Sequence, residues 1–266
     1  MIRIQQLNKG YADNPVLRGI DLQVQAGEFL VILGQSGAGK STLLRCINRL
    51  AHADSGVLEV GGVDAMQASQ QRELRRRVAM IFQHHNVVPR LSVLKNVLTG
   101  RLAYCSTLAS LLQLFRREDV ALAHDCLGRV ELSDKASARA DSLSGGQLQR
   151  VGIARALAQR PDVILADEPV ASLDPKTAHL VMRYLREATR TLGITVVCNL
   201  HQVDLARAFG DRIVGLASGR LVFDGPAQAL DDAALQRIYH SAAPRQPGDT
   251  PLAENLPIAS GTRART

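Results

Sequence analysis

A glycine-rich stretch near the N-terminus carries the residue types needed to hold a chain of phosphates. Its residues are Gly34, Gln35, Ser36, Gly37, Ala38, Gly39, Lys40, Ser41 and Thr42. Glycines let the backbone turn so that successive N–H groups point at phosphate oxygens. We expect Lys40 to reach the β- and γ-phosphates and the Ser41 hydroxyl to bind Mg²⁺. The pattern therefore predicts a P-loop for a nucleoside triphosphate.

The segments on either side of this stretch favour the same interpretation. The apolar run 29–33 precedes it and is typical of a strand, and 43–47 continues it as a helix. A strand, a glycine-rich turn and a helix form the context in which this motif binds phosphate. The helix N-terminus adds partial positive charge. The alternative, a glycine-rich turn that binds nothing, is disfavoured by this context.

Two adjacent carboxylates, Asp167 and Glu168, follow a second apolar run at 163–166. A run that is apolar throughout indicates a strand buried on both faces. Asp167 at its end can hold Mg²⁺ through water, and Glu168 can orient and deprotonate the water that attacks the γ-phosphate. An ordinary pair of carboxylates at a strand end is the alternative. The P-loop upstream favours the catalytic interpretation.

A second turn suited to anions precedes a predicted helix at 147–159. It consists of Ser144, Gly145 and Gly146, followed by Gln147. A serine and two glycines at a helix N-terminus offer free N–H groups to a phosphate. One nucleotide cannot occupy two distant phosphate sites in one chain. We therefore expect a head-to-tail homodimer with each ATP between the P-loop of one copy and the Ser-Gly-Gly turn of the other.

The elements that must position these residues indicate an α/β fold. Alternating apolar residues predict strands at 2–7 and 20–24, with a short strand at 57–60, whereas Tyr11 falls in a polar, turn-rich stretch. Further strands are expected at 78–82, 163–166 and 194–198, and a hairpin around Ser218 and Gly219 joins 213–216 to 221–223. Helices are expected at 93–102, 109–115, 119–130, 147–159 and 175–192.

This order predicts a P-loop NTPase with a mostly parallel core sheet, an antiparallel β-subdomain and an inserted helical subdomain. We expect the nucleotide-binding domain to span 1–240 and the helical subdomain to span about 84–160. The segment 241–266 is rich in Pro, Ala, Arg, Thr and Gly, and we expect it to lack a fixed structure.

The composition limits the possible partners. A net charge of +7 and a pI of about 9.6 favour association with anionic lipid or a partner loop. No Trp, five Phe and four Tyr argue against the stacking surfaces that single-stranded nucleic acid needs. The four cysteines are widely spaced, so neither a zinc site nor a disulfide framework is expected. The N-terminus has no secretory pattern, and the apolar segment near 108–115 is too short to span a bilayer.

Taken together, these motifs resemble the ATP-binding subunits of ABC transporters over roughly residues 2–239. The resemblance implies that Tyr11 stacks on adenine and that Gln83 contacts Mg²⁺ and senses the transmembrane partner. It identifies Ser144 to Gln147 with the signature motif and residues 172–174, including Asp174, with the D-loop. His201 matches the switch histidine that contacts the γ-phosphate. Both sites of a homodimer are then expected to hydrolyse ATP with Mg²⁺ as cofactor.

Three segments, 82–102, 168–175 and 200–206, are more similar to the ATPases of phosphonate importers than to those of importers in general. The added segment 104–117 also resembles the ATPases of phosphonate importers. Asn199, by contrast, stands where relatives often carry a small residue or Thr. The resemblance implies an ATPase at the cytoplasmic face of the inner membrane that powers uptake of phosphonate, phosphite or a related oxyanion. Its partners would be transmembrane permease subunits and, through them, an extracytoplasmic substrate-binding protein.

Two alternatives remain open at this point. One is an ABC-type ATPase without a transport role, such as an accessory subunit of a carbon–phosphorus lyase complex. The other is an ATPase that acts on nucleic acid in repair or translation. ATPases of the second kind usually carry long coiled-coil insertions or two ATPase domains, and this chain has neither, so we expect no nucleic-acid partner.

Overall fold

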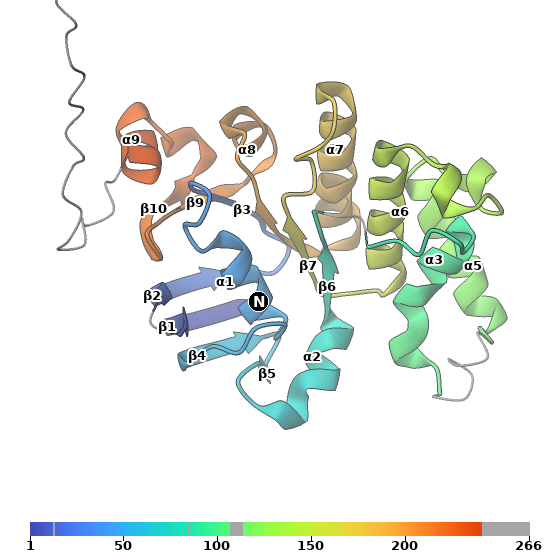
Figure 1. Cartoon of the computed structure of the whole chain (residues 1–266), viewed down its shortest axis with the longest axis horizontal. Coiled ribbons are helices and arrows are strands. Elements are labelled where there is room, and N and C mark those ends of the chain that lie inside the picture. Colours follow the sequence, from blue (N-terminus) through green and yellow to red (C-terminus); the bar gives the residue numbers. More distant parts are fainter. Residues whose placement is uncertain (13, 84–85, 107–113, 241–266) are drawn as a thin grey trace, which may run out of the picture.

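A computed structural model describes residues 1–12, 14–83, 86–106 and 114–240 of the chain. Most of the helix predicted at 109–115 and the whole segment 241–266 lie outside these residues. The described strands form two sheets (Figure 1). The smaller is antiparallel, in the order β2-β1-β4-β5, with bounds β1 Ile2–Tyr11, β2 Asn14–Val24, β4 Ser55–Val60 and β5 Val63–Asp64.

The larger sheet has six strands in the order β10-β9-β3-β8-β7-β6. Its neighbours pair in parallel from β9 to β6, and only β10 runs antiparallel. The mostly parallel core predicted from the sequence is confirmed. The strands are β3 Phe29–Leu33, β6 Val78–Ile81, β7 Val163–Asp167, β8 Thr195–Asn199, β9 Arg212–Ala217 and β10 Arg220–Pro226.

Helices cover both faces of this sheet (Figure 1). Along β3, Val31 belongs to the core beneath α7, whereas Leu30 and Ile32 belong to the core shared with α1 and the antiparallel sheet. Alternate side chains of a strand point to opposite faces, so a strand covered on both faces is apolar throughout. The helices are α1 Lys40–Ile47, α2 Gln71–Arg77, α3 Val93–Leu98, α5 Arg117–Arg129, α6 Gly145–Ala158, α7 Pro175–Leu192, α8 Val203–Phe209 and α9 Asp232–His240.

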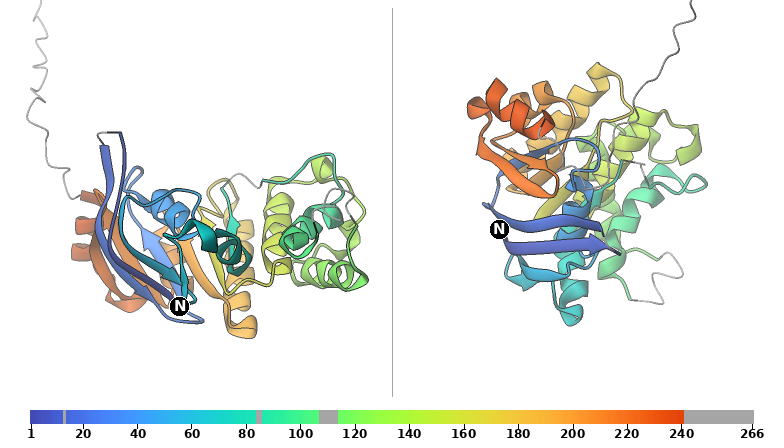
Figure 2. Two further views of the ribbon diagram at one scale, coloured as in Figure 1. Left: turned by 90° about the horizontal axis from the view of Figure 1, so that it is seen from below. Right: turned by 60° about the vertical axis from the view of Figure 1, so that its left-hand side comes forward.

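Between β6 and β7 the described chain is helical, and α3, α5 and α6 pack against one another at the end of the molecule remote from the antiparallel sheet (Figure 2). That they form a separate subdomain over 84–160 stays a prediction. The helix predicted at 93–102 is shorter: α3 ends at Leu98 and a 3₁₀ helix, η2, covers Thr99–Tyr104. Gly100 there lies so close to the carbonyl of Arg155 that a Cβ would overlap it.

The N-terminal strand is longer than its alternation predicts. β1 continues to Tyr11, which pairs with Asn14 of β2, so Tyr11, predicted in a polar, turn-rich stretch, is the last residue of a strand that was predicted to end at residue 7. The register shifts along this hairpin, beginning between Ile4 and Leu7, and such bulges interrupt a period-two pattern. The hairpin around Ser218 and Gly219 is confirmed, with φ angles of 48° and 78° at its two turn residues.

Candidate nucleotide site

The P-loop joins the carboxyl end of β3 to the first residue of α1, Lys40. Lys40 is 4% exposed as a residue. Its ammonium group donates to the carbonyls of Gly34 at 2.8 Å and Gln35 at 3.1 Å. Burial lowers the pKa of Lys40, and the nearby carboxylates of Glu168 and Asp167 act against that shift. The structure thus holds a cation over the loop, close to both carboxylates.

Two glycines allow the loop to lie between neighbouring strands. Gly39 has a φ of 106°, and a Cβ on it would lie 2.9 Å from a methyl carbon of Leu17 in β2. A Cβ on Gly34 would overlap the carbonyl of Leu216 in β9. Only glycine fits position 39, because the φ of Gly39 lies in the left-handed region and the space that a Cβ would need is occupied.

Residues beyond Leu216 support the P-loop, a role that no sequence pattern indicates. The N–H of Gly219 donates to the Ala38 carbonyl at 3.1 Å. The Gln35 side chain donates to the carbonyl of Tyr239 in α9, and the Tyr239 hydroxyl lies 3.4 Å from the His201 carbonyl. Only the folded chain reveals these supports, because each joins segments far apart in sequence.

Asp167, at the end of β7, meets α1 through a hydrogen bond. The Ser41 hydroxyl donates to Oδ1 of Asp167 at 2.8 Å, and the side-chain amide of Asn199 donates to the same oxygen at 2.8 Å. Mg²⁺ prefers oxygen ligands and in nucleotide sites uses one or two carboxylates, waters and substrate phosphates. A serine hydroxyl beside a buried carboxylate fits that ion. Among the described residues no three His, Cys, Asp or Glu side chains form an all-protein metal site.

Glu168 and His201 face one another across the ends of β7 and β8. Nε2 of His201 lies 2.5 Å from Oε1 of Glu168, and the two side chains are 42% and 18% exposed respectively. Glu168 has a φ of 51°, in the left-handed region. A residue with a side chain pays about 1–2 kcal/mol for that conformation. Such strain, maintained by the surroundings, is a common property of functional sites.

The structure places two further predicted residues without showing a contact to the phosphate site. Gln83 is exposed and follows β6, which pairs with β7, so it leaves the same sheet edge as Asp167. Tyr11 is 51% exposed at the end of β1, and the Lys9 ammonium lies 5.0 Å from its ring centroid. An exposed ring there has room to stack on a base. Both roles stay predictions.

The Ser-Gly-Gly turn begins α6, away from the P-loop. Ser144 and Gln147 form a reciprocal capping box at its N-terminus, and Ser144 and Gly145 are exposed. Whereas α6 packs on α3, α5, α7 and β6, α1 packs on β2, β7 and β8. Asp174 caps α7 by accepting the Thr177 N–H at 3.1 Å, and hydrogen bonding with Thr177 lowers the pKa of Asp174. A role for Asp174 toward nucleotide stays a prediction.

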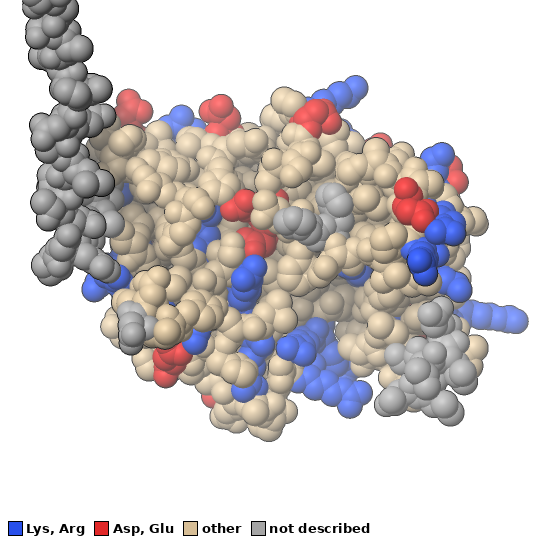
Figure 3. Space-filling view, in the orientation of Figure 1, with Lys and Arg blue, Asp and Glu red and all other residues tan. Residues whose placement is uncertain are grey.

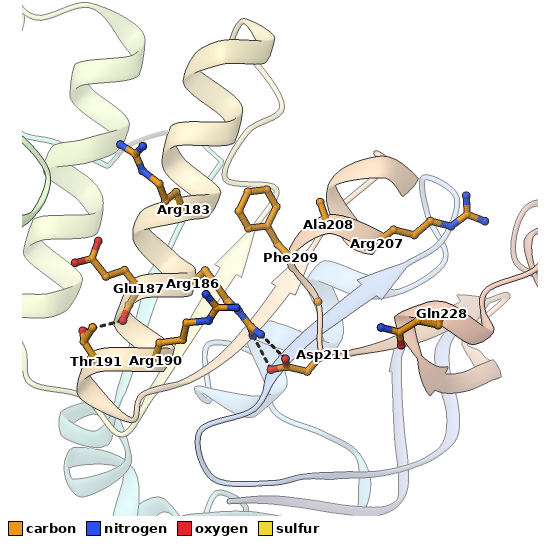
Figure 4. Close-up of a pocket in the computed structure, with 11 residues that line it drawn as sticks. Arg183, Arg186, Glu187, Arg190, Thr191, Arg207, Ala208, Phe209, Asp211 and Gln228 are labelled. Carbon is orange, nitrogen blue, oxygen red and sulfur yellow. Dashed lines mark hydrogen bonds and ion pairs between the residues drawn. The ribbon is translucent and has the colours of Figure 1, made fainter.

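A cavity of about 610 Å³ lies at a different place, between α7, α8 and the start of β9 (Figure 4). In Figure 4 Arg183 and Arg207 point away from one another. Arg186 makes two hydrogen bonds to Asp211, at 2.5 and 2.7 Å. Asp211 also accepts the Phe29 N–H at 2.9 Å. The polar residues here tie α7 to the beginning of β3, the strand that leads to the P-loop.

Comparison with known proteins shows the family of the chain. The family model described as ABC transporter matches residues 17–171, which include the P-loop, the Ser-Gly-Gly turn, Asp167 and Glu168. The chain belongs to the ABC transporter family. Membership implies nucleotide binding and an ATPase activity coupled to transport. Predicted from motifs alone, this family assignment is confirmed.

Among the curated relatives of this ABC transporter subunit is a phosphonates import ATP-binding protein of Thiobacillus denitrificans. It is 55% identical over 239 residues, which cover 90% of this chain and 92% of the relative. A phosphite import ATP-binding protein of Stutzerimonas stutzeri is 50% identical over 252 residues, covering 94% of this chain and 91% of that protein.

Solved structures of ATP-binding cassettes confirm the fold. A dimeric post-hydrolysis cassette bound to ADP and phosphate is 32% identical with a TM-score of 0.73, covering 86% of this chain and 100% of that one. The ADP conformation of another ABC transporter cassette is 27% identical with a TM-score of 0.79, covering 89% and 97% of the two chains.

Proposed function

We propose that this chain is the ATP-hydrolysing subunit of an importer for phosphonate, phosphite or a related phosphorus oxyanion. The observation that carries the proposal is that Lys40, Ser41, Asp167, Glu168 and His201 meet at one edge of the parallel sheet. The similarity to the phosphonate and phosphite import proteins supports the choice of cargo.

The residues divide the work of phosphoryl transfer. Lys40 neutralises charge on the β- and γ-phosphates, and the loop N–H groups hold the phosphate chain. Glu168 accepts a proton from the attacking water, and His201, in contact with Glu168, holds that carboxylate toward the γ-phosphate. Ser41, Asp167 and Gln83 would hold Mg²⁺, which when bound would offset the negative charge of the phosphates.

A second copy would complete each site. Ser144 and Gly145 are exposed at the start of α6, so they are available to a nucleotide on another chain. A solved bacterial ABC transporter cassette of similar fold is dimeric. This supports a homodimer, in which ATP would lie between the P-loop of one copy and Ser144 to Gln147 of the other. Closure on ATP and reopening after hydrolysis would supply the movement for transport.

The homodimer would lie at the cytoplasmic face of the inner membrane, beneath the permease subunits. An extracytoplasmic binding protein would supply these subunits with cargo. Among the described residues no helix is long and apolar enough to cross a membrane. Lys and Arg side chains gather at the lower edge of Figure 3, over α2, where Arg72 and Arg75 are exposed. Such a surface suits association next to anionic headgroups.

A pull-down with the Glu168→Gln chain tests this proposal. The variant removes the general base, so ATP and Mg²⁺ should trap a closed dimer and preserve labile complexes. We expect turnover to fall about 10²–10⁴-fold and a multi-span permease to be recovered in detergent. The permease's binding protein, assayed against phosphonate, phosphite and phosphate, then identifies the cargo.

The same experiment separates the alternatives. Recovery of soluble carbon–phosphorus lyase subunits, with the closed dimer formed, would replace transport by an accessory role. Nuclease-sensitive recovery of nucleic acid under those conditions would favour the repair or translation class. Wild-type protein with ATP omitted serves as the control for nonspecific capture of membrane proteins.

A further inference from the structure

Asn199 is a buried polar residue beside Asp167 whose role the site described so far does not use. It ends β8, and Asp167 ends β7, and the two residues are register partners in the parallel pair. Leu165 and Val197, two residues earlier on each strand, belong to the core on the α1 side. Residues two apart on a strand share a face, so Asp167 and Asn199 both face α1.

The contacts of Asn199 constrain one carboxylate oxygen. Its side-chain N–H and the Ser41 hydroxyl each donate to Oδ1 of Asp167 at 2.8 Å. A carboxylate oxygen offers about two lone-pair positions, so these donors occupy Oδ1 and neither uses Oδ2. Two donors from different elements, β8 and α1, leave the carboxylate little freedom to rotate.

The burial of Asn199 distinguishes this amide from an ordinary core residue. The residue is 0% exposed, and its Oδ1 is buried with no hydrogen-bond partner among the described residues. A residue required only for packing would be apolar, as Val197 and Leu200 are on the same chain segment. Burying an amide with one unpaired oxygen is unfavourable, so the useful part of the side chain is the N–H group aimed at Asp167.

We propose that Asn199 is a positioning residue that fixes the Asp167 carboxylate in the orientation required by Mg²⁺–ATP. The inference rests on the proposed function, in which Ser41 and Asp167 hold the ion. The Ser41 hydroxyl donates its one proton to Asp167 and keeps its lone pairs for a cation. Groups that hydrogen-bond to a metal-binding carboxylate commonly change metal affinity 10–100-fold when they are removed.

Asn199→Leu tests this role, because leucine has a similar volume and no donor. We expect the Mg²⁺ concentration for half-maximal ATP turnover to rise at least tenfold. Independently of activity, calorimetry should show that the affinity for ATP in EDTA is unchanged while the gain in affinity on adding Mg²⁺ falls at least tenfold. The control is Cys198→Ala, an equally buried change whose side chain belongs to the other core.

A second variant covers the case in which Asn199→Leu does not fold. Asn199→Ala removes the donor with a smaller side chain that cannot overpack the site and brings no charge, and we expect the same loss of the Mg²⁺-dependent gain. A wild-type Mg²⁺ response in a folded Asn199 variant would overturn the inference. So would a loss of ATP affinity that is equally large in EDTA and in Mg²⁺. Asp167→Asn distinguishes a failure of the proposed Mg²⁺ site from a failure of the role assigned to Asn199. If that change also leaves the Mg²⁺ response intact, the proposed site itself is wrong; if it abolishes the response, only the role of Asn199 is at stake.

Discussion

At the scale of single residues, the P-loop lysine combines burial with charge. Lys40 is held by two backbone carbonyls and its pKa is lowered by burial, so the folded chain keeps an ammonium in a place that disfavours it. Two carboxylates nearby offset part of that cost. The arrangement has a functional explanation, because the same charge is available to a nucleotide.

Lys40→Met should therefore affect binding more than folding. Methionine keeps most of the unbranched side chain and removes the charge, so we expect ATP affinity to fall at least tenfold, as for the loss of a charged hydrogen-bond donor worth about 1.5–3 kcal/mol. Stability without nucleotide should change by less than about 1.5 kcal/mol, because no ammonium has to be buried. Calorimetry and chemical denaturation measure the two effects. Lys176→Met, on the exposed start of α7, is the control and should alter neither.

At the scale of elements, α6 approaches α7 through a glycine. A Cβ on Gly146 would lie 2.6 Å from Cγ2 of Thr177. Gly146→Ala should destabilise the fold by about 1–3 kcal/mol through overpacking, measured by denaturant unfolding. Thr177→Ser removes the methyl group and keeps the hydroxyl, so the double variant should recover most of that loss. A double variant as unstable as Gly146→Ala would show that the Thr177 contact is not the cause.

The link between α7 and β3 gives a prediction that depends on pH. Asp211 accepts hydrogen bonds from Arg186 and from the buried Phe29 N–H, and the Arg186 guanidinium lowers the pKa of that carboxyl. Asp211→Ala should cost about 1–3 kcal/mol near neutral pH, since a buried donor loses its acceptor.

A carboxyl group whose pKa is lowered in the folded state stabilises the fold at pH values above its pKa in the unfolded state, about 3.9. This stabilisation is lost as the pH falls through the pKa of the folded state. The difference in unfolding free energy between wild type and Asp211→Ala should accordingly be constant between about pH 5 and 8 and shrink below about pH 4. Urea denaturation across this range measures it. A difference that grows in acid would contradict the assigned role of the carboxylate.

At the scale of the whole molecule, the proposed function uses a second copy, in which the Ser-Gly-Gly turn at the start of α6 would complete the P-loop site of the first. Ser144→Asp tests this requirement. Aspartate is as good an N-cap as serine, so the fold should be retained, but its charge would face the γ-phosphate bound to the other copy. We expect Glu168→Gln to form an ATP-dependent dimer in sedimentation experiments and Glu168→Gln with Ser144→Asp to remain monomeric.

Asparagine at the same position is the matched neutral control. Ser144→Asn keeps a capping side chain without the charge and should leave most of the dimerisation intact. If both substitutions abolished the dimer equally, a steric or folding effect rather than charge would be responsible. If neither did, the turn would not face the nucleotide.

Features that depend on neighbouring residues could be predicted from the amino-acid sequence. The glycine-rich turn, the strands at Phe29–Leu33 and Val163–Asp167 and the helix from Pro175 follow from residue types and short-range patterns, and the structure has them nearly where they were predicted. Motif order also indicated the family and most of the candidate site. The part of β1 that extends to Tyr11 was missed because bulges in the β1–β2 hairpin break the alternation on which strand prediction depends.

Which of these residues meet depends on how the chain folds. Parallel strands are joined through helices, so the register that pairs Asp167 with Asn199 is set by packing between segments far apart in sequence. The contact of Glu168 with His201 and the support of the P-loop by Gly219 and Tyr239 arise in the same way. A residue's type shows what chemistry it can do, but the fold decides which partner it does it with, because that depends on distances that no local pattern records.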